Sequence, residues 1–161
     1  MPLLIRAATN DDLAVLARLN EPVQSLHAAL YPADFKGNVD TADVASFFEH
    51  VAATPESSIA IAEQDGVLVG YIWFDISARH ENAFNPPQSF VYIHHVSVAA
   101  DARRRGVASA MLAYTKEQAH AGGVDEVRLD RWIANVEALR FFEAHGFTPL
   151  SVMLRRSVFT W

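Results

Sequence analysis

The chain has 161 residues, of which 51% are hydrophobic, 11% aromatic and 20% charged, with a formal net charge of −6 and no cysteine. This length and composition predict a single folded domain over residues 1–161 and exclude a disordered chain. The acidic balance disfavours a nucleic-acid partner, because nucleic-acid binding depends on neutralising phosphates. The lack of cysteine excludes a disulfide scaffold, a thiolate nucleophile and a cysteine-based metal site.

The sequence predicts neither a membrane span nor a secretion signal. Its longest apolar run, Val67 to Phe74, is far shorter than the ~20 residues that a spanning helix needs. The N-terminus reaches Arg6 and Asn10-Asp11-Asp12 without a signal-peptide core. We therefore expect a cytoplasmic protein with no membrane partner.

The first half of the chain predicts one strand, two helices and a hairpin. Residues 3–7 are typical of a short strand, and Thr9 is expected to cap a helix that Pro22 kinks or splits. Asp40 begins a second helix, which ends at Thr54-Pro55. The apolar runs 58–63 and 67–76 surround Asp65-Gly66, which is a strong hairpin signal.

The second half alternates strands with helices. After a polar loop over residues 79–89, we expect strands at 90–98, 126–133 and 150–155, and helices at 106–121 and from Asn135 to Gly146. The complete order is β-α-α-β-β-β-α-β-α-β. This order predicts an α/β fold whose mixed sheet is covered by helices on both faces.

The stretch from Val96 to Ala108 carries the clearest sign of ligand chemistry. A strand ends there, and a helix begins at Gly106 directly after Arg103, Arg104 and Arg105. Cations are disfavoured at the positive end of a helix dipole unless an anion shares the site, and the first turn of a helix offers N–H groups to such an anion. The pattern therefore indicates a phosphate site. A solvated basic turn before an ordinary helix is the alternative.

Two motifs resemble those of one family. The run Arg-x-x-Gly-x-Ala at 103–108 resembles the pyrophosphate-binding signature of GNAT-type N-acetyltransferases. Residues 135–147 resemble the second family signature, Asn-x-x-Ala-x-x-Phe-Tyr-x-x-x-Gly-Phe, and the order of elements matches along nearly the whole chain. The resemblance implies a mostly antiparallel sheet in which the fourth and fifth strands are parallel and splay apart.

The resemblance also implies an acetyl-CoA site in that gap. The backbones of Val96 and Val98 would pair with the pantetheine arm, and the amides from Arg104 to Ser109 would hold the pyrophosphate. The full set of implied cofactor-binding residues is Val96, Ser97, Val98, Arg103, Arg104, Arg105, Gly106, Val107, Ala108, Ser109, Asn135, Phe141 and Phe142. Asn135 is expected to cap its helix as well.

Phe142 departs from the family pattern. Many members carry a tyrosine there, whose hydroxyl protonates the leaving thiolate, and phenylalanine has no proton to donate. Either water or another group would then supply the proton. Core packing is the plain structural expectation for Phe142.

The fourth strand supplies the candidates for catalysis, which are His94, Tyr92 and His95. By a period of two, Tyr92 and His94 are expected to share one face with Val96 and Val98, while His95 and Ser97 lie on the other. Some family members place a Glu or His at the positions of Tyr92 and His94, beside the acyl group. Since histidine titrates near neutral pH, His94 is the preferred general base, ahead of His95.

Plain packing in a polar part of the strand, or a dimer contact, is the alternative for this histidine pair. No histidine pair has a metal-ligand spacing with a carboxylate, so we expect no metal.

The favoured function is transfer of an acetyl group from acetyl-CoA to a primary amine by direct attack in a ternary complex. The acceptor would be a small molecule or an amine of a peptide or protein, framed by residues 26–36 and 79–89, with Asp34, Asp75 and Glu81 able to hold a cation. The alternatives are a non-catalytic acyl-CoA sensor, which Phe142 favours, and an unrelated phosphate-binding module. A homodimer stays open.

Overall fold

A computed structural model describes residues 2–160 of the chain. The contacts divide the chain into two compact units, Met1–Asp130 and Arg131–Trp161. No helix in the described range is long and apolar enough to cross a membrane.

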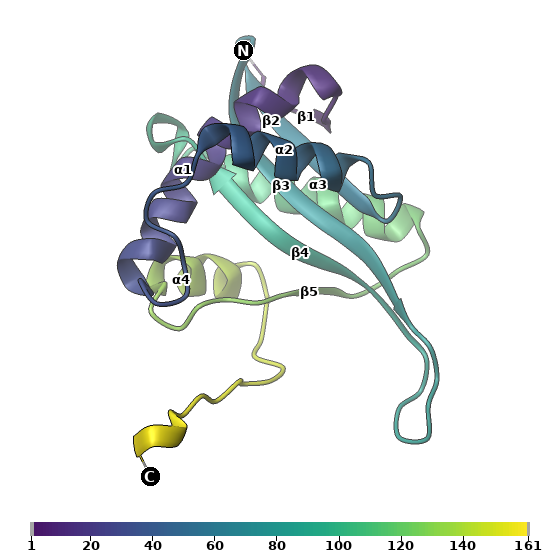
Figure 1. Ribbon diagram of the computed structural model, residues 1–161. Helices are drawn as coiled ribbons and strands as arrows, with labels where there is room; N and C mark the ends of the chain where they lie inside the picture. Colours follow the sequence, from purple (N-terminus) through teal and green to yellow (C-terminus); the bar gives the residue numbers. More distant parts are fainter. Residues whose placement is uncertain (1, 161) are drawn as a thin grey trace. The chain divides into compact units, whose positions relative to one another are not determined.

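One mixed sheet runs through the first unit (Figure 1). Its strands lie in the order β1 (Leu4–Ala7), β2 (Ser57–Gln64), β3 (Val67–Arg79), β4 (Gln88–Val98) and β5 (Val127–Leu129). The first four strands pair antiparallel, whereas β4 and β5 pair in parallel over Val91–Ile93. The predicted α/β class, with a mostly antiparallel sheet and a parallel pair of fourth and fifth strands, is confirmed.

The hairpin between β2 and β3 is also confirmed. Asp65 and Gly66 form its two-residue turn, and both have positive φ angles, of 55° and 77°. Such a turn matches the right-handed twist of the strands, which is why Asp-Gly favours it.

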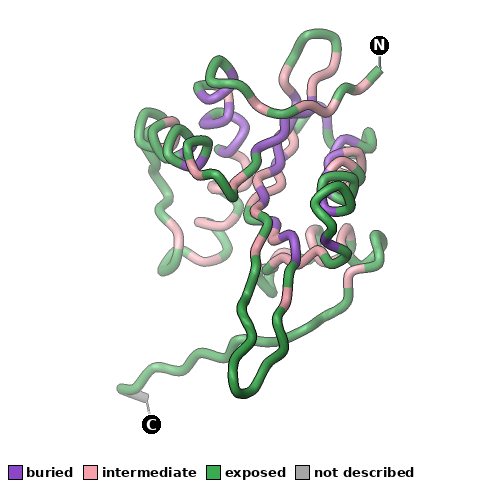
Figure 2. Tube along the Cα trace, turned by 90° about the vertical axis from the view of Figure 1, so that its right-hand side faces the viewer, coloured by how far each residue is buried: buried purple, intermediate pink, exposed green. Residues whose placement is uncertain are grey.

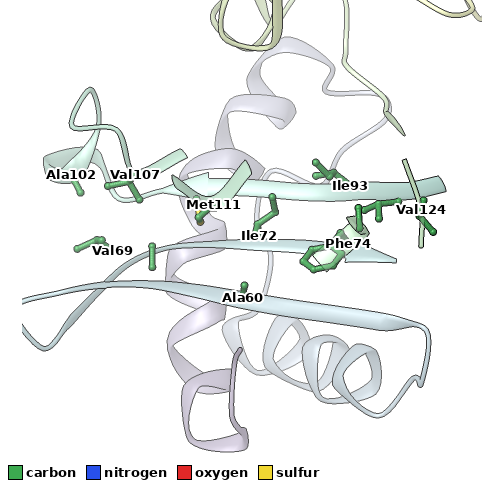
Figure 3. Packing of buried hydrophobic residues seen from close by; sticks show 12 residues of the cluster. Ala60, Val69, Ile72, Phe74, Ile93, Ala102, Val107, Met111 and Val124 are labelled. Carbon is green, nitrogen blue, oxygen red and sulfur yellow. The ribbon is translucent and has the colours of Figure 1, made fainter. Parts of the chain in front are cut away.

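Helices cover both faces of the sheet. In Figure 1, α1 (Leu13–Leu30) and α2 (Thr41–Ala52) lie in front of the strands, and α3 (Val107–Ala121) lies behind them. The front helices bury Leu16 and Phe48 against Tyr71 of the sheet. On the back, Met111 of α3 lies beside Ile72 (Figure 3). Buried residues accordingly follow the central strands and the inner sides of these helices, while the β3–β4 loop is exposed (Figure 2).

The start of the first helical segment is built as the sequence predicts. A 3-10 turn, Asn10–Asp12, leads into α1, and the Asp12 carboxylate accepts hydrogen bonds from the Thr9 N–H at 2.7 Å and the Thr9 hydroxyl at 2.9 Å. Arg6 donates to the same carboxylate at 2.7 Å, and this holds the pKa of Asp12 well below its usual range.

Of the two outcomes predicted at Pro22, a kink or a split, the split does not occur, because α1 runs unbroken through this residue. A proline inside a helix costs about 3 kcal/mol, whereas full burial of one leucine contributes about 1.5–3 kcal/mol. Leu13, Leu16 and Leu19 are all buried against the sheet, so their burial outweighs the local cost.

The second unit contains α4 (Val136–Ala144). The Asn135 side chain accepts a hydrogen bond from the Ala138 N–H at 3.1 Å, which confirms the predicted cap. Gly146 follows with a φ of 83°, as expected after a helix end.

Two strand predictions need correction. The strand expected at 126–133 is confined to Val127–Leu129, which pair with Val91–Ile93 of β4. The strand expected at 150–155 is absent from the described chain, where a 3-10 turn, Val158–Thr160, is the element after α4. Leu150, Met153 and Leu154 are exposed, and no strand in residues 2–160 pairs with this segment, although four of its six residues are apolar.

Candidate active site

A β-bulge in β4 organises the candidate catalytic residues. Tyr92 pairs with Asp75 and Ile93 with Phe74, but the next residue of β3, Trp73, pairs with His95. His94 is therefore an extra residue in β4, and the strand resumes its alternation one position later.

The bulge overturns the predicted face assignment. Val96 and Val98 pack with the α3 side of the core, on the face of Ile93. His95 contacts the ring of Phe48 on the α1–α2 side. His94 and Tyr92 lie on that same side, where His94 stacks on Trp73 and Tyr92 contacts His94. A strict period of two failed because it assumed that every residue of β4 has a partner on β3.

His94 is held by three contacts. Its Nε2 lies 2.6 Å from Asp75 Oδ2, and its ring stacks on Trp73 with centroids 4.1 Å apart and planes at 14°. The edge of Tyr92 completes the surroundings, at 4.9 Å between centroids. Ser57 donates a hydrogen bond to the other oxygen of Asp75 at 2.5 Å. The imidazole is partly open to solvent, with its side chain 28% exposed.

His95 belongs to a different, more enclosed network. Its Nδ1 lies 3.1 Å from the Tyr71 hydroxyl, which accepts a hydrogen bond from Asn20 at 2.8 Å. Since that hydroxyl has one proton, it donates it to His95 Nδ1, and the ring proton of neutral His95 then sits on Nε2. Burial, followed by the nearby His94 and His27, lowers the pKa of His95 to about 4. His95 is therefore neutral at physiological pH.

Tyr92 is also placed to remain neutral. Its hydroxyl donates to the Asp130 carboxylate, and burial together with this carboxylate raises its pKa to about 12. Tyr92 and Asp75 line one open pocket of about 470 Å³, together with Glu56, Ser77, Arg79 and Phe90. Asp75, the hydrogen-bond partner of His94, therefore joins a second carboxylate, Glu56, in the lining of this pocket.

The other side of β4 offers backbone groups rather than side chains. Ala99 donates its N–H to Val69 of β3 at 2.8 Å. Because successive residues of an antiparallel strand direct their backbone groups to alternate edges, Val96 and Val98 direct theirs away from β3. Beyond Ile93, no strand in the described chain pairs with that edge. The Val98 carbonyl accepts a hydrogen bond from Arg103 at 3.2 Å.

The bulge explains why these two residues face the open edge. Val91 donates its N–H to Glu126 at 2.9 Å, on the β5 side. Without the extra residue at His94, His95 and Ser97 would continue that alternation. With it, Val96 and Val98 take the edge, and Ser97 turns inward, where its hydroxyl donates to the Leu19 carbonyl at 2.5 Å.

The turn before α3 forms a cradle of backbone amides and arginines. Arg104 and Gly106 adopt left-handed conformations, with φ of 62° and 81°, and Arg103, Arg104 and Arg105 are exposed. Gly106 occupies the N-cap position and has no side chain to cap the first turn of the helix. Apart from its chain neighbours, no residue of the described range 2–160 lies within 4 Å of the point where a Cβ on Gly106 would sit, so the space above the turn is open. The side chain of Val107 is buried in the core.

The family-derived residues of the second unit lie on α4. Phe141 and Phe142 contact each other with centroids 5.2 Å apart, and Phe142 contacts Phe147 at 5.4 Å. Both are half-buried, and α4 has no fully buried residue. Asn135 uses its side chain in the helix cap, as described above.

Sequence reasoning missed the partners of His94 and His95. The sequence indicates Asp75 only as a carboxylate for a cationic substrate, and Ser57, Tyr71 and Asn20 belong to no motif. The available signal was the alternation of Tyr71, Trp73 and Asp75 in β3, which places all three on one face. Among residues 2–160, no group of three or more potential ligands is arranged to hold a metal ion.

Comparisons with known proteins agree with the two motifs. Two curated relatives match part of the chain: mycothiol acetyltransferase of Thermobispora bispora is 35% identical over 98 residues, and an N-alpha-acetyltransferase of Sulfurisphaera tokodaii is 31% identical over 110. The first match covers 60% of this chain and 32% of the relative, and the second covers 66% and 65%. The chain thus spans about a third of the first relative and just under two thirds of the second.

Solved structures show the same fold at low identity. A tetramutant of the BH1408 protein from Bacillus halodurans superposes with a TM-score of 0.89 at 20% identity, over 96% of this chain and 99% of that one. The aminoglycoside N-acetyltransferase AAC(6')-Iy, solved with CoA, gives 0.73 at 20% identity, over 98% and 95%. The acetyltransferase (GNAT) family model matches residues 22–147, which is most of the chain, and the chain therefore belongs to this family.

Proposed function

We propose that this chain is an N-acetyltransferase that transfers the acetyl group of acetyl-CoA to a primary amine by direct attack in a ternary complex. Residues 1–161 would act as one acetyltransferase domain. The observation that carries the proposal is the amide and arginine cradle before α3, placed at the end of a strand whose outer edge is open beside it. Membership of the acetyltransferase family supports the same activity.

The cradle fits an anionic pyrophosphate. The first turn of a helix presents N–H groups and a positive dipole end, and arginine suits phosphate oxygens. The open space above Gly106 is what a close approach of phosphate to backbone requires. Arg103, Arg104 and Arg105 with the amides of residues 104–109 would hold the pyrophosphate, and the backbones of Val96 and Val98 would bind the pantetheine arm. Bound acetyl-CoA supplies the acetyl group as a reactive thioester.

His94 is the proposed general base. Its imidazole is partly open to solvent and borders the pocket through Asp75, so it would accept a proton from the incoming ammonium. His95, which is enclosed and neutral, is the weaker candidate, and Tyr92 would orient the acceptor. The Val96 N–H, at the open edge, would polarise the thioester carbonyl.

The second unit contributes by family resemblance alone. Asn135, Phe141 and Phe142 would border the cofactor, and neither phenylalanine can protonate a thiolate. Water is the proposed proton donor.

The proposal extends to the chemical class of the amine acceptor. The relatives are named for mycothiol and for N-alpha-acetylation, and one structural neighbour for an aminoglycoside, so the names point to different amines. The pocket carboxylates Glu56 and Asp75 favour a cationic acceptor. We further propose a cytoplasmic location and a homodimer, and native mass spectrometry would test the latter.

A panel assay tests the activity. Acetyl-CoA is incubated with polyamines, aminoglycosides, amino acids and N-terminal peptides, and free CoA thiol is measured. We expect release with at least one amine and a turnover about 10²-fold lower for His94→Ala, with acetyl-CoA binding unchanged. If the protein binds acetyl-CoA but no amine of the panel leads to thiol release, it is instead the non-catalytic sensor that the absence of a tyrosine at position 142 favours.

A further inference from the structure

We infer that Asp75 and Ser57 are positioning residues, which fix the neutral imidazole of His94 with its proton on Nε2 and its lone pair on Nδ1. This inference rests on the proposed function, since it names the atom of His94 that would take the proton from the acceptor amine. The family motifs cover neither Asp75 nor Ser57. The three residues lie on three adjacent strands, with Ser57 on β2, Asp75 on β3 and His94 on β4.

Hydrogen-bond directions along this chain of groups follow from a single donor. Trp73 Nε1 can only donate, and it lies 3.4 Å from Ser57 Oγ. The Ser57 hydroxyl therefore uses its own proton toward Asp75 Oδ1, at 2.5 Å. The remaining oxygen, Oδ2, is an acceptor 2.6 Å from His94 Nε2, so the neutral imidazole carries its proton there.

The bulge is what makes this contact possible. Tyr92 is the register partner of Asp75, and His94 is the unpaired residue between the pairs of Asp75 and Trp73. Its ring can therefore stack on Trp73 while its Nε2 reaches the carboxylate. No hydrogen bond within the described residues occupies Nδ1, which is the nitrogen left to accept a proton.

In the proposed step, a proton moves from the acceptor ammonium to Nδ1 of His94. An ammonium N–H bond breaks, the proton bonds to Nδ1, and its electron pair stays on the amine nitrogen, which becomes the nucleophile. The imidazolium that forms keeps its Nε2–H on Asp75, so the new charge lies next to a carboxylate. The other titratable groups around this imidazole are Tyr92 with Asp130 and the neutral His95.

The variant Asp75→Asn tests the arrangement. Because Ser57 still donates, the new amide turns its carbonyl toward Ser57 and its NH₂ toward His94. The NH₂ then donates to Nε2, which moves the imidazole proton to Nδ1. We expect ¹⁵N NMR of the free protein at pH 8 to show the Nε2–H form of His94 in the wild type and the Nδ1–H form in Asp75→Asn. Turnover should fall about 10²-fold, as for loss of the base, with acetyl-CoA affinity unchanged.

The double variant Asp75→Asn/Ser57→Ala is the sharper prediction. Without the Ser57 hydroxyl, the amide is free to rotate and offer its carbonyl to His94, so the Nε2–H form and part of the activity should return. Glu117→Gln, which removes an exposed carboxylate of α3, is the charge-matched control and should leave the NMR signals of His94 unchanged. Asp75→Ala gives a second measurement, since it should produce a mixture of both forms.

The inference is overturned if Asp75→Asn keeps the Nε2–H form, or if the form changes and turnover does not. A wild-type protein that fails to bind acetyl-CoA overturns the proposed function instead. The two failures are separable, because the protonation site of His94 is read in the protein without any ligand.

Discussion

Acidification should weaken the fold through His95. This histidine has its pKa lowered from 6.5 to about 4 in the folded chain, chiefly by burial. Between these two values the unfolded chain binds a proton that the folded chain does not, so the free energy of unfolding falls as the pH falls from about 6.5 to 4. A pKa difference of one unit corresponds to about 1.4 kcal/mol, so the titration of His95 can lower the free energy of unfolding by at most about 3 kcal/mol. Because His95 keeps partial exposure, we expect about 1–2 kcal/mol.

Urea denaturation at a series of pH values from 4 to 7 measures this loss. His95→Gln is the reference variant, since it keeps a polar group beside Tyr71 but does not titrate. The wild type should lose about 1–2 kcal/mol more than the variant over this interval. An equal pH dependence of the two proteins would refute the view that His95 is held neutral by its surroundings.

Two further substitutions test the packing of the sheet and the role of the second motif. Gly70→Ala should lower the free energy of unfolding by about 1–3 kcal/mol, because its Cβ would lie 2.8 Å from the Ser97 carbonyl oxygen and 3.3 Å from Met111; an unchanged urea midpoint would contradict this contact. Phe142→Tyr should raise thiol release modestly at saturating substrates, well below the 10²–10⁴-fold of complete acid catalysis. A large loss of activity with a lower melting temperature would make Phe142 a packing residue only.

Local signals were sufficient for much of the fold. The Asp65-Gly66 turn and the Asn135 cap depend on residues adjacent in the chain, and both are present. The turn before α3 also carries a local signal, because three arginines before a helical glycine conflict with the helix dipole unless an anion is bound, and its role as a phosphate site stays a prediction.

Features that depend on pairing with another strand could not be predicted from the sequence. The bulge at His94 exists because Trp73 and Asp75, on another strand, pair with His95 and Tyr92. Nothing in the run of residues 90–98 marks which one is the extra residue, although the adjacent histidines are unusual in an otherwise apolar strand. The segment 150–155 is as apolar as a short strand, yet a strand forms only where another edge supplies hydrogen bonds.

Binding of acetyl-CoA to wild-type protein and to Gly106→Glu tests the central claim most directly. The glutamate would add bulk and negative charge where the pyrophosphate is proposed to lie. Gly123→Glu is the matched control, since Gly123 also has a positive φ, of 71°, and an open Cβ position, but lies beyond the other end of α3, ~22 Å away.

At about 100 times its dissociation constant, acetyl-CoA should stabilise the wild type by about 2.7 kcal/mol, which raises the melting temperature by about 5–10 °C. The control should respond equally and the folded Gly106→Glu should not respond. An undiminished shift in Gly106→Glu would contradict the assignment of the cradle to the cofactor.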